Sequence, residues 1–306
     1  MPAGGRVIFT SGATEALNWA IKGAPPGDVV TIATEHAAVL NTVEGLAASG
    51  RAANILPVDR EGLVEERVAY EAIVPGVSMV AAMLVNNEIG VIQPIPMLGR
   101  LASHAGAPLL CDAVQGFGRV PIPDGCDLVA VSAHKIYGPK GIGALWIRDG
   151  VALSPLLHGG DQEGGRSGTL SPALCAGFGA AATLMAERFD ADAAHVARLW
   201  DVALAALGGG WTVNGSVEHR YRGNLNVRFP GLDVARLMSD LSDIAFSAGS
   251  ACASGSGRPS HVLRAIGLSD AEARSSIRLG FGRYTTEAQL ADACVRIGAA
   301  AWAQAE

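Results

Sequence analysis

The sequence predicts an α/β fold with a mostly parallel central sheet and helices on both faces, followed by a smaller α+β C-terminal domain. Strand-like runs alternate with helical runs through the first half of the chain, as parallel strands joined by crossover helices require. After Gly168 the order changes to a long alanine-rich helical stretch and then to short strands separated by helices. We therefore expect a large domain at residues 1–189 and a small domain at residues 190–306.

Each strand expected in the large domain is a short apolar run. The run DLVAVSAH, for example, is one that a sheet would bury on both faces. The expected strands are residues 6–10, 28–34, 77–85, 108–113, 127–133 and 142–148, and the expected helices are 14–23, 37–49 and 96–106.

The second half has fewer strands and longer helical stretches. Residues 171–207 are rich in alanine and predict one or two helices. Beyond them, the expected strands are 224–229, 244–248 and 275–281, and the expected helices are 233–241 and 286–304.

Composition describes a globular protein, because 49% of the 306 residues are apolar and 17% are charged. A net charge of −6 without any basic stripe argues against nucleic-acid binding. The sequence has no signal-like start and no apolar run of membrane-spanning length, so we expect a cytoplasmic protein with no membrane contact. The five cysteines lack CxxC spacing, so neither disulfides nor a metal site is expected.

The segment TSGATEALNW passes from a strand into a helix through a glycine. Backbone N–H groups at the start of that helix, with the Thr14 hydroxyl, would form an anion site. Ordinary helix capping by Ser or Thr explains the same residues when the segment is taken alone.

Polar groups also follow two later strands of the predicted sheet. Asp112 ends the run PLLCD, at the carboxyl edge where ligands of such folds bind, although an aspartate there could also cap a turn. Lys135 follows DLVAVSAH, where a lysine is either a snorkelling surface residue or a nucleophile. A phosphate site, a carboxylate and a lysine together suit pyridoxal 5'-phosphate: the lysine forms a Schiff base with the aldehyde, and the carboxylate keeps the pyridine nitrogen protonated.

Ten segments, in the expected order from about Arg6 to about Leu290, resemble the cysteine desulfurases. That family belongs to the class V aminotransferase superfamily of fold-type I PLP-dependent transferases. The Ser-rich segment around Cys252 resembles the iron–sulfur-cluster branch, whose cysteine lies on a long loop. The segments are FTSGATEALNWAIKG, TEHAAVL, VNNEIGVIQP, CDAVQ, SAHKIYGPKGIGALWIR, HGG with RSGT, NLNVRFPG, FSAGSACASG, SHVLRAIG and SSIRLGFGRYTTEAQL.

The resemblance assigns roles to residues of this chain. Lys135 would bind the cofactor covalently and move protons, Asp112 would bond the pyridine nitrogen, and His36 would stack on the ring. Arg278 would clamp the substrate carboxylate, a task that suits a planar guanidinium. Further contacts would come from Ala13, Thr14, Ser132 and His134 to the phosphate, from Gln115 and Asn87 to the ring oxygen and substrate, and from Thr169 to the phosphate of the other subunit of a homodimer.

Several of these residues also have plainer interpretations. His36 could be a loop histidine bonded to backbone, Asn87 could serve a turn, and Arg278 could be solvated. Cys252 is different, because the glycines and small residues of SAGSACASGSG predict a mobile loop. A mobile loop suits a thiol that takes up sulfur and delivers it elsewhere. The remaining cysteines, at 111, 126, 175 and 294, lie in apolar or helical segments and are expected to pack.

The expected reaction converts L-cysteine to L-alanine and leaves a persulfide on Cys252. That sulfur would supply iron–sulfur cluster or other thio-cofactor assembly through an acceptor such as an iron–sulfur scaffold. Alternatives are a selenocysteine lyase, a class V aminotransferase that needs no cysteine at 252, and a catalytically impaired homologue acting as a binding partner. Two departures keep the last alternative open: the family's further N-terminal segment has no counterpart here, and GGDQEGGRSGT is one residue shorter than the family pattern.

Overall fold

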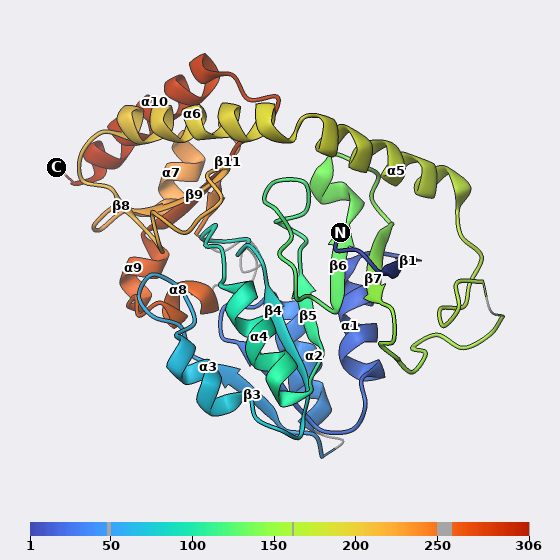
Figure 1. The fold of residues 1–306 in the computed structure, drawn as a ribbon. Coiled ribbons are helices and arrows are strands. Elements are labelled where there is room, and N and C mark those ends of the chain that lie inside the picture. The colour runs from blue at the N-terminus through green and yellow to red at the C-terminus, as the bar shows by residue number, and fades with distance from the viewer. Residues whose placement is uncertain (48–49, 161, 250–258, 306) are drawn as a thin grey trace. The chain divides into compact units, whose positions relative to one another are not determined.

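The computed structural model describes residues 1–47, 50–160, 162–249 and 259–305, which Figure 1 colours from the N-terminus to the C-terminus. Contacts within the chain divide it into two compact units. The last residue of unit 1 is Arg188, close to the expected boundary near residue 190. Two short earlier segments also belong to unit 2, and a single boundary does not describe them. Unit 1 comprises residues 1–57, 64–85 and 93–188, and unit 2 comprises 58–63, 86–92 and 189–306.

Unit 1 contains a seven-stranded sheet in the order β1-β7-β6-β5-β4-β2-β3. Only β7 runs antiparallel to its neighbours among the strands described, so the sheet is mostly parallel, as expected. The strands are β1 (Gly5–Thr10), β2 (Asp28–Ile32), β3 (Ala53–Leu56), β4 (Val77–Met83), β5 (Leu109–Asp112), β6 (Leu128–Ser132) and β7 (Gly143–Arg148).

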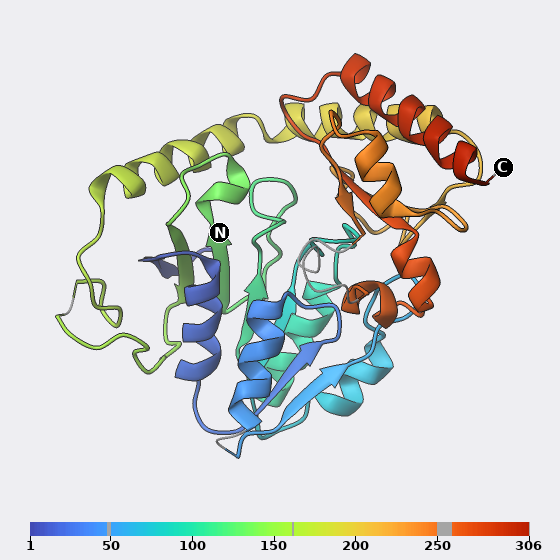
Figure 2. The same cartoon turned by 180° about the vertical axis from the view of Figure 1, so that it is seen from behind.

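Helices cover both faces of this sheet. In Figure 1, α3 and α4 lie in front of the strands, and Figure 2 shows α1 and α2 on the other face. Because both faces are covered, β4 is buried along nearly its whole length, which explains its continuous apolar run. The helices of unit 1 are α1 (Ala13–Gly23), α2 (Ala37–Ala47), α3 (Glu66–Ala72), α4 (Ile95–Ala105) and α5 (Pro172–Glu187), with a 3-10 turn, η1 (Ala133–Ile136).

The sequence did not predict β3 or α3. β3 is an edge strand that pairs only with β2 in the described sheet, and just one of its four residues is fully buried. Its sequence therefore lacks the apolar run that is typical of the inner strands. Pairing with β2, rather than a hydrophobic pattern, identifies these residues as a strand.

Unit 2 contains a four-stranded antiparallel sheet in the order β10-β11-β9-β8. In its core, α6 and α10 pack against each other and against the strands. Among the helices in the described ranges, none is long and apolar enough to cross a membrane. The strands are β8 (Thr212–Val213), β9 (Asn224–Arg228), β10 (Ser247–Ala248) and β11 (Ser276–Gly280), and the helices are α6 (Phe189–Leu207), α7 (Val234–Asp240), α8 (His261–Ala265), α9 (Asp270–Arg274) and α10 (Glu287–Ala305).

A buried arginine holds the segment 86–92 in unit 2. Arg220 donates from Nη2 to the carbonyls of Ile89 (2.7 Å) and Asn224 (2.9 Å). Its guanidinium also lies 4.3 Å from the ring centre of Trp200. Burial lowers the pKa of Arg220 to about 10, well above neutral pH, so the side chain remains a cation that binds backbone carbonyls.

Candidate functional site

Lys135 lies on η1, a single turn that begins directly after β6. The turn ends at Tyr137, whose φ of 65° is left-handed, and the Gly138 N–H donates to the Ala133 carbonyl (2.9 Å). From the other side, Arg119 Nη2 donates to the Lys135 carbonyl (2.5 Å). The backbone that carries the half-buried Lys135 side chain is therefore fixed on both sides.

Asp112 ends β5, the parallel neighbour of β6, and is only 5% exposed. Its Oδ1 accepts a hydrogen bond from the Val114 N–H (2.9 Å). Burial raises the pKa of Asp112 to about 6, while the Val114 N–H and the charge of Lys135 oppose the rise. At neutral pH, Asp112 is therefore a buried carboxylate within the electrostatic reach of Lys135.

The residues expected to bind phosphate meet at the start of α1. The Ala13 N–H donates to Ser132 Oγ (2.9 Å), which joins the start of α1 to the end of β6. The N-cap residue of α1 is Gly12, which has no side chain to cap the helix, and the Ala13 N–H uses Ser132 Oγ as its acceptor instead. A Cβ on Gly143 would lie 2.7 Å from Gly12 Cα, so β7 approaches this helix start closely because residue 143 is a glycine. An uncapped helix N-terminus carries partial positive charge and suits an anion.

Two other residues expected at the phosphate, Thr14 and His134, are exposed. Desolvation, together with the positive charges of Lys135 and Lys140, lowers the pKa of His134, so its ring is neutral near pH 7. A neutral imidazole can donate one hydrogen bond and accept another.

His36 immediately precedes α2, and its Nδ1 accepts a hydrogen bond from the Ala38 N–H (3.1 Å). This agrees with one of the two interpretations of His36 from the sequence, a loop histidine bonded to the backbone. It orients the ring and places the proton of neutral His36 on Nε2.

Gln115 is linked to Lys135 by a residue that the sequence did not single out. Arg119 Nη1 donates to Gln115 Oε1 (2.9 Å), while Nη2 of the same arginine donates to the Lys135 carbonyl. Only the spacing of four residues between Gln115 and Arg119 could have indicated their contact.

Within unit 2, Asn87 and Arg278 lie together. Arg278, on β11, donates from Nη1 to the Asn87 carbonyl (2.8 Å), and Asn224 Nδ2 donates to the same oxygen (2.9 Å). Glu88 next to them is 2% exposed and accepts a hydrogen bond from Ser260 Oγ. Burial raises the pKa of Glu88, opposed by the Ser260 hydroxyl and by the charges of His261 and Arg278. The sequence did not indicate Glu88, because only burial distinguishes it from a turn carboxylate.

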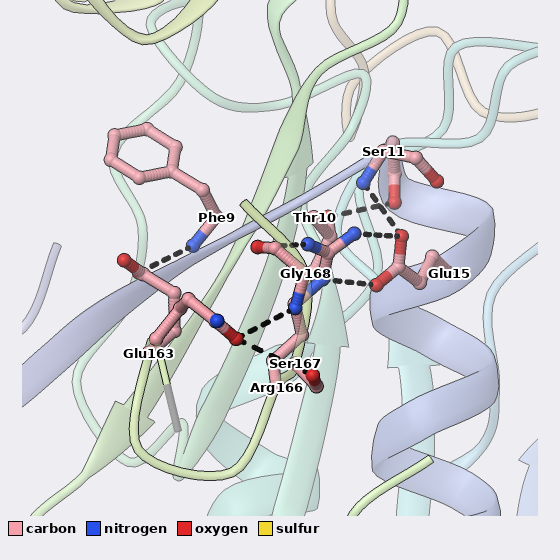
Figure 3. A network of polar contacts seen from close by, with 10 residues as sticks. Phe9, Thr10, Ser11, Glu15, Glu163, Arg166, Ser167 and Gly168 are labelled. Atoms are coloured by element: carbon pink, nitrogen blue, oxygen red, sulfur yellow. Dashed lines mark hydrogen bonds and ion pairs between the residues drawn. The ribbon is translucent and has the colours of Figure 1, made fainter. Parts of the chain in front are cut away.

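Thr169 is exposed. The residues just before it, Arg166 to Gly168, lie beside Glu15 at the start of α1 (Figure 3). Arg166 donates from Nε to Glu15 Oε1 (2.9 Å) and from Nη2 to Oε2 (3.3 Å), and both side chains are mostly buried. Burial raises the pKa of Glu15, but hydrogen bonds from Arg166 and Ser11 and the charge of Arg166 outweigh it, so the pKa lies below its ordinary value. Gln162 Oε1 also accepts from the Gly168 N–H (2.9 Å), which fixes the turn just before Thr169.

Cys252 lies outside the described residues, so its expected loop has no structural description. The other four cysteines are free thiols: Cys111, Cys126 and Cys294 are buried, and Cys175 is half-buried. These positions agree with packing roles.

The carboxyl edge of the unit 1 sheet thus presents an amine, a buried carboxylate and an uncapped helix start with a hydroxyl beside it. Such groups could hold, respectively, a carbonyl carbon, a protonated ring nitrogen and a phosphate. Glu35, three residues after the end of β2, is a further carboxyl group at this edge that the sequence did not single out.

A model of the aminotransferase class-V family matches residues 2–292. The chain is 47% identical over 298 residues to a mitochondrial cysteine desulfurase of Eremothecium gossypii. The match covers 93% of this chain and 61% of that protein. It is 42% identical to the cysteine desulfurase IscS of Rickettsia bellii, over 93% of this chain and 73% of the relative. Among solved structures, a NifS-like protein is similar with a TM-score of 0.88 and 31% identity, over 96% of this chain and 82% of that one.

The chain therefore spans about three fifths of the length of the mitochondrial relative that it matches.

Proposed function

Because the chain belongs to the class V aminotransferase family, we propose that it is a cysteine desulfurase that uses pyridoxal 5'-phosphate. It would convert L-cysteine to L-alanine and transfer the sulfur to Cys252 as a persulfide. The observation that carries the proposal is the interaction of the Asp112 carboxylate with Lys135 at the ends of neighbouring parallel strands. The names of the relatives support the choice of reaction.

The donor set in unit 1 fits the cofactor. An amine can bind an aldehyde, and a carboxylate buried beside it can hold a protonated pyridine nitrogen. The uncapped start of α1, with Thr14 and Ser132 close to it, offers N–H and hydroxyl donors for a phosphate. These three kinds of donor match the three polar parts of pyridoxal 5'-phosphate.

We assign the binding roles accordingly. Lys135 would hold the aldehyde carbon, Asp112 would accept from the pyridine N–H, and the Nε2 side of His36 would lie toward the ring. The phosphate would be held by Ala13, Thr14, Ser132 and His134, and the ring oxygen by Gln115. When bound, pyridoxal 5'-phosphate supplies an electron sink that weakens the Cα–H bond of an attached amino acid.

The chain's own residues would carry the remaining steps. Arg278 would bind the carboxylate of L-cysteine, with Asn87 beside it, and this orients the substrate. The Lys135 amine would take the Cα proton. The Cys252 thiolate would then attack the substrate sulfur, so that an S–S bond forms while the C–S bond breaks. The electron pair of that C–S bond stays with Cβ, which takes up a proton. Lys135 would return the proton to Cα, so that alanine leaves.

We also propose that two copies of the chain act together. Thr169 is exposed, and the turn just before it is held by Arg166, which pairs with Glu15, and by Gln162, which supports a contact from Thr169 to the phosphate in a second copy. The sulfur acceptor would be a further protein, such as a scaffold for iron–sulfur clusters.

The test begins with the visible absorption spectrum of the purified chain after addition of pyridoxal 5'-phosphate. We expect a band that Lys135→Ala removes and that L-cysteine shifts, whereas Lys140→Ala, an exposed neighbour, keeps the band. Failure of the wild-type chain to bind the cofactor would contradict the proposal and favour the impaired, binding-only homologue.

A second assay follows products. Wild-type protein should form alanine and a protein-bound persulfide from L-cysteine, and Cys252→Ser should form no persulfide while still shifting its spectrum with L-cysteine. Alanine production at the native rate by Cys252→Ser would rule out the assigned role of that thiol. Much faster turnover of L-selenocysteine, or pyruvate-dependent amino transfer, would indicate the alternative activities.

A further inference from the structure

Two buried carboxyl groups lie at the same edge of the unit 1 sheet. Glu35 comes three residues after the end of β2 and is 0% exposed, and Asp112 ends β5. Carboxylates are almost never fully buried unless a cation or several donors stabilise them. The proposed function uses only Asp112, so the presence of Glu35 needs a separate explanation.

The Glu35 side chain and the Asp112 backbone are connected through β4, the strand between β2 and β5. Glu35 Oε1 accepts a hydrogen bond from the Met83 N–H (2.5 Å), and Met83 is the register partner of Asp112. On the other side, the Leu84 N–H donates to the Asp112 carbonyl (2.9 Å). Glu35 therefore extends the β2–β4 pairing with a side-chain acceptor and holds the end of β4 against which Asp112 lies.

The charges around Glu35 favour its neutral form. Burial, and then the negative charge of Asp112, raise the pKa of Glu35 well above its ordinary value, and the Met83 N–H only partly opposes this. The Cys111 thiol, a further titratable group of β5, stays neutral, since its interaction with Cys126, burial and the charges of Asp112 and Glu35 raise its pKa. The cation of this edge, Lys135, lowers the pKa of Asp112. Asp112 therefore ionises first.

We propose that Glu35 is a positioning residue that acts through Asp112: it remains a neutral carboxylic acid on the Met83 N–H and leaves Asp112 as the single ionised carboxylate at this edge. The inference rests on the proposed function, because a single, defined charge is what a protonated pyridine nitrogen would require. A glutamine at position 35 would reproduce this neutral partner, whereas a leucine would fill the space without accepting from the Met83 N–H.

The direct test needs no cofactor. Difference infrared spectra in H2O and D2O, at about pH 8 where Asp112 is ionised, should show the carbonyl band of a protonated carboxylic acid. Glu35→Gln should remove this band, and Glu44→Gln, a change at an exposed position of α2, should retain it. Absence of the band in the wild-type protein, or its persistence in Glu35→Gln, would overturn the proposal.

Cofactor affinity then tests the positioning role. Glu35→Gln should bind pyridoxal 5'-phosphate within about twofold of wild type, and Glu35→Leu should bind it about tenfold more weakly, as the loss of one hydrogen-bond acceptor predicts. A tenfold loss in Glu35→Gln would mean that the site needs a negative charge at residue 35, which would overturn the proposal even if Glu35→Leu fails to fold. If the wild-type chain binds no cofactor, the proposed function fails, while the infrared result still decides the state of Glu35.

Discussion

Glu15 and Glu35 are two shielded glutamates of unit 1 that differ in their charge. Glu15 lies in the first turn of α1, the helix that follows β1, and Glu35 lies three residues after the end of β2. Glu15 is paired with Arg166, and its pKa lies below the ordinary value. Glu35 faces Asp112 instead, and its pKa lies well above that value. Burial opposes ionisation at both sites, so the partner that the fold supplies decides the charge of each carboxyl group.

The largest change in stability should come from giving Glu15 a carboxylate as its neighbour, as Glu35 has in Asp112. Arg166→Glu would place a second carboxylate against Glu15, and we expect it to lower the free energy of unfolding by about 3 kcal/mol at neutral pH. Urea unfolding measures the change. The control is Arg67→Glu, because Arg67 pairs with Glu71 on the surface, with both side chains more than 60% exposed. That change should lower the free energy of unfolding by less than about 1 kcal/mol.

Similar losses in the Arg166→Glu and Arg67→Glu variants would show that the Glu15–Arg166 pair behaves as an ordinary surface ion pair.

A smaller effect should come from removing the acceptor that Glu35 provides. Glu35→Leu leaves the buried Met83 N–H without this partner and should lower the free energy of unfolding by about 2 kcal/mol. Glu35→Gln keeps the acceptor. Its free energy of unfolding should lie within about 1 kcal/mol of wild type at mildly acidic pH, where Glu35 is neutral like the glutamine that replaces it. Urea midpoints for the two variants provide the comparison, and a glutamine variant as unstable as the leucine variant would contradict it.

The smallest effect, but the one that separates the two glutamates most clearly, is the sign of the pH dependence. Above the ordinary pKa of 4.5, native Glu35 keeps a proton that the unfolded chain releases, so its contribution to stability falls as pH rises toward its raised pKa. Glu15 has the opposite sign: its contribution is complete above 4.5 and is lost as pH falls through its lowered pKa.

Unfolding free energies from acid to neutral pH should therefore diverge. Relative to wild type, Glu35→Gln should gain stability as pH rises, and Glu15→Gln should lose it. Equal slopes for the two variants would refute the assignment of opposite charge states.

Comparison with known proteins and the described structure confirms the fold class and the family resemblance that the sequence predicted. Hydrophobic patterning was sufficient for this, because strands covered on both faces must be apolar throughout. Strand ends also placed Asp112 and Lys135 correctly at one edge, since parallel strands finish on the same side of a sheet. The roles of these and the other expected site residues remain proposals, with Cys252 outside the described residues.

The sequence by itself determined the order of the inner strands and longer helices, the family and the chemistry-bearing residues at the strand ends. Only the tertiary structure decided that Glu35 lies against Asp112, that Glu15 pairs with Arg166, and that the segment 86–92 belongs to unit 2. The physical reason is that a side chain's charge and contacts depend on groups from distant parts of the chain. A local sequence pattern shows whether a position is apolar. The charge of a buried carboxyl group depends on a neighbouring group that only folding places beside it.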